Sequence, residues 1–158
     1  MAINPNTDFT SGAVLTAAQQ NRFPRGVMAL ATSTTSYTLT TTETIATGMT
    51  VTFTAVANRY YRISYFEPQA QTSSIASNTT ITIRQTNAAG TVLNNTIFAN
   101  ETAALDQSGM FCTRTLTFSA GSITVVGCAK VSATTSAPAL IRDSTRQAQL
   151  LIEDIGPA

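Results

Sequence analysis

The chain has 158 residues and a formal net charge of +1, and only 11% of its residues are charged. An average soluble domain has about 25% charged residues, so uncharged polar groups must cover much of this surface. The balanced charge argues against a nucleic-acid binder, which needs a basic patch to neutralise phosphates. The length predicts one domain with a core of its own, and no apolar run approaches the roughly 18 residues of a membrane span.

The first 25 residues predict an attachment arm that ends in one short helix. Residues 1–12 show no hydrophobic period, whereas Thr16 followed by Gln19 is a capping box at a helix start. The helix must be short because Pro24 disfavours a helical backbone at the residue before it. The apolar side chains expected to anchor this arm are Phe9, Val14, Leu15 and Phe23.

From Gly26 onward the sequence predicts strands only. Threonine occupies 30 of the 158 positions and often alternates with apolar residues, as in Met49–Phe53 and Thr80–Ile83. This β-branched residue suits a pleated surface, and the period of two sends alternate side chains to a core. The expected strands are Gly26–Thr32, Tyr37–Ile45, Met49–Val56, Arg59–Pro68, Thr79–Gln85, Thr91–Phe98, Met110–Ser119, Ser122–Val131 and Gln147–Ile155.

About eight or nine short strands, roughly ten residues apart, indicate an all-β fold, an antiparallel β-sandwich of jelly-roll type. Residues 1–25 would be the arm and short helix, and residues 26–158 the sandwich body. Three loops are expected at Gln69–Asn78, Ala99–Gly109 and Ala133–Thr145. The expected core comprises Met49, Val51, Phe53, Tyr61, Ile63, Tyr65, Ile81, Ile83, Phe111, Leu116, Phe118, Val125, Leu150 and Ile152.

The two cysteines, Cys112 and Cys128, are expected to be buried free thiols. Their spacing does not fit a metal site, and the chain has no histidine to assist. If their strands formed a hairpin about Gly121, the two thiols would lie near each other, so a disulfide stays open as the alternative.

The sequence offers little for catalysis. Without histidine, neither a Ser-His-Asp nor a Cys-His arrangement can form. Glu153 and Asp154 are adjacent in a strand and must point to opposite faces, while Glu67 and Glu101 make only a nominal glycosidase pair. We therefore expect no enzyme, no catalytic residues, no cofactor and no metal.

Two basic segments have two interpretations each. Arg59 and Arg62 beside Tyr60 are either solvated or salt-bridged arginines of a strand, or a patch that binds a sugar or a partner. The stretch from Arg142 to Arg146 is either a polar loop or a contact between subunits. The weakly charged surface favours an oligomer, because copies with few charges repel each other little.

The two ends of the chain carry a more specific pattern. Residues 8–26, DFTSGAVLTAAQQNRFPRG, resemble the F-x-x-G-x-V-L-T-A-A-x-x-N opening of small tailed-bacteriophage virion proteins, which are common in actinobacteriophages. The closing LIEDIGPA of residues 151–158 is similar to the V-E-D-I-G-P ending of the same group. Residues 51–61, VTFTAVANRYY, are similar as well.

This resemblance implies a virion structural protein, a fibre, spike or tail-associated β-sandwich that assembles as trimers on the particle. Its expected partners are further copies and other virion proteins, with no nucleic acid and no membrane. It would be made in the host cytoplasm, since residues 1–6 lack the features of a signal peptide. The alternatives are a module that binds carbohydrate on the host surface, or a capsid-decorating stabiliser.

Overall fold

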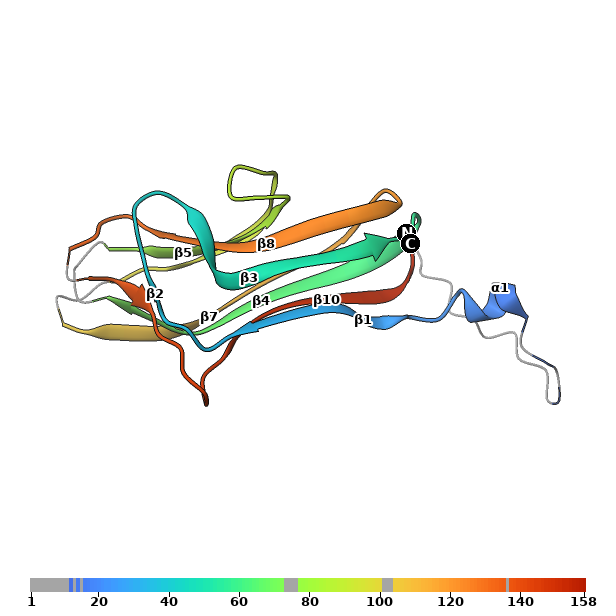
Figure 1. Ribbon diagram of the computed structural model, residues 1–158, viewed down its shortest axis with the longest axis horizontal. Coiled ribbons are helices and arrows are strands. Elements are labelled where there is room, and N and C mark those ends of the chain that lie inside the picture. Colours follow the sequence, from blue (N-terminus) through green and yellow to red (C-terminus); the bar gives the residue numbers. More distant parts are fainter. Residues whose placement is uncertain (1–11, 13, 15, 73–76, 101–103, 136) are drawn as a thin grey trace.

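The computed structural model describes residues 12, 14, 16–72, 77–100, 104–135 and 137–158. Within them the strands form two antiparallel sheets packed face to face, which confirms the all-β sandwich. Figure 1 shows an elongated body, with the single helical turn α1 (Ala17–Gln20) lying beyond one end. The capping box closes this turn, because the Gln19 backbone N–H donates to the Thr16 hydroxyl at 3.2 Å and the Thr16 N–H donates to the Gln19 side chain at 2.9 Å.

In the described residues the larger sheet has six strands: β1 (Gly26–Ser33), β2 (Tyr37–Thr38), β4 (Arg59–Thr72), β7 (Asp106–Thr117), β9 (Ala139–Leu140) and β10 (Ala148–Pro157). The smaller sheet has four strands in the same part of the chain: β3 (Thr44–Ala55), β5 (Thr79–Gln85), β6 (Val92–Phe98) and β8 (Gly121–Val131).

The long strands follow jelly-roll order. They run β1-β10-β4-β7 in the larger sheet and β3-β8-β5-β6 in the smaller one. Between consecutive long strands the chain therefore changes sheet at every step except β5 to β6. At one side of the sandwich, β7 lies next to β6, and the Asn94 amide donates to the Thr113 carbonyl at 2.6 Å.

Some expected boundaries were wrong. Gly48 falls between two of the expected strands but lies inside β3, at a bulge between Ile45 and Thr50, where its φ of 78° is readily adopted only by glycine. The expected strand Tyr37–Ile45 is instead the short β2, a segment that crosses the outside of the smaller sheet, and the first two residues of β3. There Glu43 pairs with Arg84 at 2.6 Å. In addition, β4, β7 and β9 take up parts of the three expected loops.

The core lies between the sheets, and most of the expected core residues are buried there. An aromatic group of Phe53, Tyr61 and Phe118 fills one end, with ring centroids 5.1 to 5.9 Å apart. The Tyr61 hydroxyl accepts from the Val56 backbone N–H at 2.8 Å, so this ring is buried without an unpaired polar atom.

Phe111 was wrongly expected in the core. It is 56% exposed, because β7 turns Met110 and Cys112 inward and alternation sends Phe111 outward. It lies opposite Phe66 on the outer surface of the larger sheet. Leu116, also expected in the core, is only partly buried.

Cys112 and Cys128 are both free and buried. The hairpin about Gly121 that the disulfide alternative required does not form, because β7 belongs to the larger sheet and β8 to the smaller one. Cys112 points into the core, whereas Cys128 shares the outward face of β8 with Val126, beneath the segment that carries Glu43. Burial raises the pKa of each thiol to about 11.

Both thiols should therefore react very slowly with iodoacetamide at neutral pH. The reacting species is the thiolate, and very little of it is present at neutral pH when the pKa of the thiol is about 11. Mass spectrometry should show an unmodified native chain and two modifications after unfolding in urea. Rapid native labelling of either thiol would contradict this burial.

Candidate functional surface

The outer face of the larger sheet carries an ordered pattern of side chains. Because paired residues lie side by side, register places them in rows across β1, β10, β4 and β7. One row contains Leu30, Leu151, Ser64 and Thr113, and the next contains Thr32, Gln149, Phe66 and Phe111. The row on the other side contains Val27, Glu153, Arg62 and Thr115.

Four apolar side chains form the middle of this face, which we call the apolar patch: Leu30, Leu151, Phe66 and Phe111. Leu30 is 54% exposed, Phe66 38% and Phe111 56%. A shallow groove of about 450 Å³ runs along the patch between its two phenylalanines and Arg62. Exposed apolar groups gathered in this way mark an interaction surface more often than scattered ones do.

Arg62 borders the patch and is neutralised within the chain. Its guanidinium pairs with Glu153 of β10 at 2.8 Å, and about half of the Arg62 side chain remains exposed. The pair can therefore contact a partner without presenting a net charge to it. Of the expected surface-binding residues, Arg62 is the one that lines this groove.

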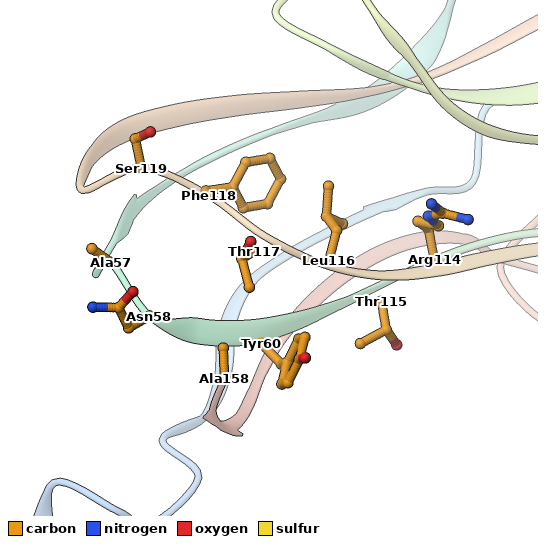
Figure 2. Close-up of a pocket in the computed structure, with 10 residues that line it drawn as sticks. All are labelled: Ala57, Asn58, Tyr60, Arg114, Thr115, Leu116, Thr117, Phe118, Ser119 and Ala158. Carbon is orange, nitrogen blue, oxygen red and sulfur yellow. The ribbon is translucent and has the colours of Figure 1, made fainter. Parts of the chain in front are cut away.

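Tyr60 lies one row further along the same face of β4 and lines a separate hollow of about 770 Å³. Figure 2 shows Tyr60, Thr115 and Ala158 on one side of the β4 ribbon, with Phe118, Leu116 and Arg114 on the other. The hollow thus wraps around the edge of the sandwich and does not enclose a ligand. Its lining resembles an open polar edge more than a binding pocket.

Arg59, the third expected surface residue, is not at the surface. The side chain is 5% exposed and pairs with the fully buried Asp154 carboxylate at 2.5 Å and 2.7 Å. Strand alternation explains the difference: Arg59 shares the inward face of β4 with Tyr61, while Tyr60 and Arg62 point outward. Arg59 therefore belongs to no surface patch.

The buried Arg59 also fastens the segment after α1. Its two terminal nitrogens donate to the backbone carbonyls of Asn21 and Phe23, each at 2.6 Å. Asp154, in turn, accepts from the Gly156 N–H at 3.0 Å. We call Arg59, Asp154 and the two carbonyls the arm clamp. It fixes where the N-terminal segment leaves the body.

Two of the expected anchoring residues can be placed. Val14 is 90% exposed and Phe23 is 40% exposed, so both offer apolar surface on the N-terminal segment. Phe9 and Leu15 lie outside the described residues. The anchoring role of all four stays a prediction.

The arm clamp should control how fast a protease cuts the N-terminal segment. Trypsin can cut after Arg22, which lies between the two held carbonyls, and after Arg25, two residues beyond Phe23. Replacing Asp154 with Asn should weaken the clamp and speed cleavage at both bonds, because Arg59 loses its buried counter-charge. The control is Glu153→Gln, which removes the neighbouring exposed ion pair and should leave the cleavage rate unchanged. Equal rates in both variants would contradict the clamp.

A second buried ion pair lies at the opposite end of β4. Arg142, expected in a polar loop, is fully buried and binds Glu67 at 2.6 Å and 2.9 Å. Its other nitrogen donates to the carbonyls of Thr47 at 2.7 Å and Thr35 at 3.2 Å. The hydroxyl of Tyr65 completes the network by donating to Glu67.

Carboxylates that are paired in this way are poor candidates for acid–base chemistry. Of the six acidic residues that the structure describes, five form ion pairs: Glu43, Glu67, Asp143, Glu153 and Asp154. Glu101 of the nominal glycosidase pair is outside the described residues, while Glu67 is sealed in the core. Within the same described ranges, no group of three potential metal ligands occurs. Nor does any helix there have the length and apolarity to cross a bilayer.

The apolar patch was missed in the sequence, although a signal for it was present. Once Tyr61, Ile63 and Tyr65 are assigned to the core, alternation sends Phe66 outward. A second exposed phenylalanine beside it can be recognised only from the register between β4 and β7, which joins residues 45 apart in the chain. No local pattern encodes that register.

A scan against models of known protein families finds no match, and a search of curated proteins finds none either. Among the solved structures that match are two of weak likeness. One is dimeric latent PorU from Porphyromonas gingivalis, at 9% identity and a TM-score of 0.37. The other is the arabinose-bound MgGH51 α-L-arabinofuranosidase, at 15% identity and a TM-score of 0.30.

The two alignments cover 84% and 88% of this chain but only 13% and 24% of those chains. The chain thus spans less than a quarter of either protein. Likeness at this level carries no inference about activity or partners, and the phage resemblance of the chain ends stays a prediction.

Proposed function

We propose that this chain is a structural protein of a bacteriophage particle, a β-sandwich of fibre, spike or tail-associated type that works as several copies. The observation that carries the proposal is the arm clamp. A buried ion pair has a large desolvation cost, yet here it is placed where it holds the backbone of an N-terminal segment. Such an arrangement suits a body that is attached through one end.

The other end of the body suits display. In Figure 1, β2 and the described loops that flank it, residues 34–36 and 39–43, lie at the end of the body far from α1. They connect strands of a rigid sandwich, which is the usual way in which proteins present variable contact loops. Attachment at the clamp end would point these loops away from the particle.

The surface chemistry also supports a structural role. Most described carboxylates are consumed in ion pairs, so few are left for catalysis. The jelly roll itself occurs in viral capsid proteins as well as in lectins, and this adds only an analogy of fold. The phage-like ends of the chain are the reason for proposing a phage particle, and the resemblance implies trimers.

The test is incorporation into particles of the phage that encodes the chain. A variant without residues 1–15 keeps Asn21 and Phe23 for the clamp, so we expect it to fold. Mass spectrometry of purified particles should find the full-length chain and not the truncated one. Incorporation of the truncated chain would refute anchoring through the arm, and absence of the full-length chain would refute the proposed function.

A carbohydrate-binding module is the second candidate, favoured by the two exposed phenylalanines of the groove, on which a sugar ring could stack. It predicts saturable binding to host envelope glycans that is lost in Phe111→Ala and weakened in Arg62→Ala. Titration of the full chain with host cell-wall fragments measures this, and absence of binding would reject it.

A capsid-decorating stabiliser, the third candidate, predicts weaker capsids when the protein is missing.

A further inference from the structure

We propose that the apolar patch is an interface between two copies of this chain, related by a two-fold axis that runs parallel to the strands between β4 and β10. This rests on the part of the proposed function in which the chain works as several copies, and it assigns a two-fold contact in place of the trimer that the resemblance implies. Three observations indicate that a second copy of this chain covers the patch: the charge balance of the face, the register of its side chains and its area.

The face is neutral although it contains charged residues. Arg62 is paired with Glu153 beside the patch, and Arg146 is paired with Asp143 at the loop end, next to Phe66. An apolar centre with a polar rim is the common anatomy of a protein interface. A polyanion such as nucleic acid or an acidic glycan would find no unpaired positive charge among the residues that line the groove, whereas a second neutral face fits.

The register makes the face complementary to itself. A two-fold axis between β4 and β10 keeps each row in place and exchanges the two strands. Arg62 of one copy then lies over Glu153 of the other, and the same contact repeats by symmetry. Arg62 and Glu153 therefore form ion pairs both within each chain and across the interface.

The same rotation brings the apolar side chains together. Phe66 and Phe111 occupy one row on β4 and β7, and Leu151 and Leu30 occupy the next row on β10 and β1. After rotation, Phe66 of one copy lies one row from Leu151 of the other. Phe111 lies one row from Leu30 in the same way. The aromatic rings can therefore enter the spaces beside the leucines, which is how stacked sheets interdigitate.

The area is sufficient for a weak, specific contact. Four strands about 4.8 Å apart and four rows about 6.8 Å apart give a face of roughly 19 by 27 Å. This is roughly 500 Å² a copy and about 1,000 Å² in total, near the lower limit of specific interfaces. The pairing should depend on concentration in solution and strengthen where copies are held close together on a particle.

Sedimentation velocity of the full chain over a range of concentrations tests the pairing. The mass should rise from 16.6 kDa towards twice that value. Phe111→Glu should weaken association about tenfold or more, because it places a charge in the apolar centre. The matched control is Ile97→Glu on the outer face of the smaller sheet. Ile97 is 60% exposed, much like Phe111, and its replacement should leave association unchanged.

A charge exchange tests the two-fold register itself. Arg62→Glu alone and Glu153→Arg alone should each be monomeric, since like charges then meet across the axis. Mixing the two variants should restore the dimer. In a mixed dimer, position 62 of each copy faces position 153 of the other, and the two side chains then carry opposite charges. Circular dichroism of each variant checks that the fold is unchanged.

Three results would overturn the proposal: a chain that stays monomeric at every concentration, association that Phe111→Glu leaves intact, or single variants that fail to pair when mixed. A trimer of the wild-type chain would also overturn the two-fold contact, yet it would leave the proposed virion role standing. Absence from particles would instead refute the virion role without affecting the contact.

Discussion

Replacing Arg142 with methionine should destabilise the fold by about 3–5 kcal/mol, the usual cost of leaving one partner of a buried ion pair alone. Glu67 would then lie fully buried with Tyr65 as its remaining side-chain donor. Burial and the Glu67 charge raise the pKa of Tyr65 well above its usual range, so its hydroxyl stays protonated and cannot replace the lost positive charge. Urea unfolding followed by circular dichroism measures the effect.

Two further variants make the result specific. Arg146→Met removes an exposed arginine from the same stretch and should unfold close to the wild-type midpoint, because exposed ion pairs contribute little. The double change Arg142→Met with Glu67→Gln should recover part of the loss, because it removes the stranded charge. A single Arg142→Met variant as stable as Arg146→Met would show that the network is not buried in solution.

The second large effect is expected at Gly127 on the inner face of β8. A Cβ added there would lie 2.8 Å from Cζ of Tyr65 and 3.0 Å from Cε1 and Cε2. The ring cannot move away easily, because it is fully buried and its hydroxyl is bound to Glu67. Gly127→Ala should therefore cost about 1–3 kcal/mol through overpacking.

Gly109→Ala is the matched control for this prediction. Gly109 is an exposed position of β7, and an added Cβ would meet only the Pro68 and Glu67 carbonyls, at 3.4 Å and 3.9 Å. We expect a change within about 0.5 kcal/mol, which is typical of surface positions. Equal unfolding midpoints for the two alanine variants would contradict the close packing of Tyr65 on β8.

The fold was largely predictable because alternation is a local signal. Thr79–Gln85 matches β5 at both ends, and Met49–Val56 lies almost wholly inside β3. Features that depend on register between distant strands were not predictable. The pairing of Phe66 with Phe111 is one such feature. Phe111 itself was assigned to the wrong face of β7, whose alternation turns Met110 and Cys112 inward. The hairpin about Gly121 that the disulfide alternative required does not form, because the chain changes sheet there.

The buried ion pairs were even harder to predict from the sequence. Arg59 and Arg142 look like surface residues by type, and arginine is rarely buried without a partner. Their partners, Asp154 and Glu67, lie 95 and 75 residues away in the sequence. Only the folded sheet brings each pair together. The Glu153-Asp154 dipeptide, by contrast, was correctly expected to point to opposite faces, since that follows from strand geometry alone.

A cryo-EM reconstruction of the particle that carries this chain is the decisive measurement. We expect copies at regular symmetry positions, with residues 1–25 directed into the particle and Phe66 and Phe111 buried against a second copy. Particles without the chain, or copies attached through the loops near β2 with the patch exposed to solvent, would contradict it.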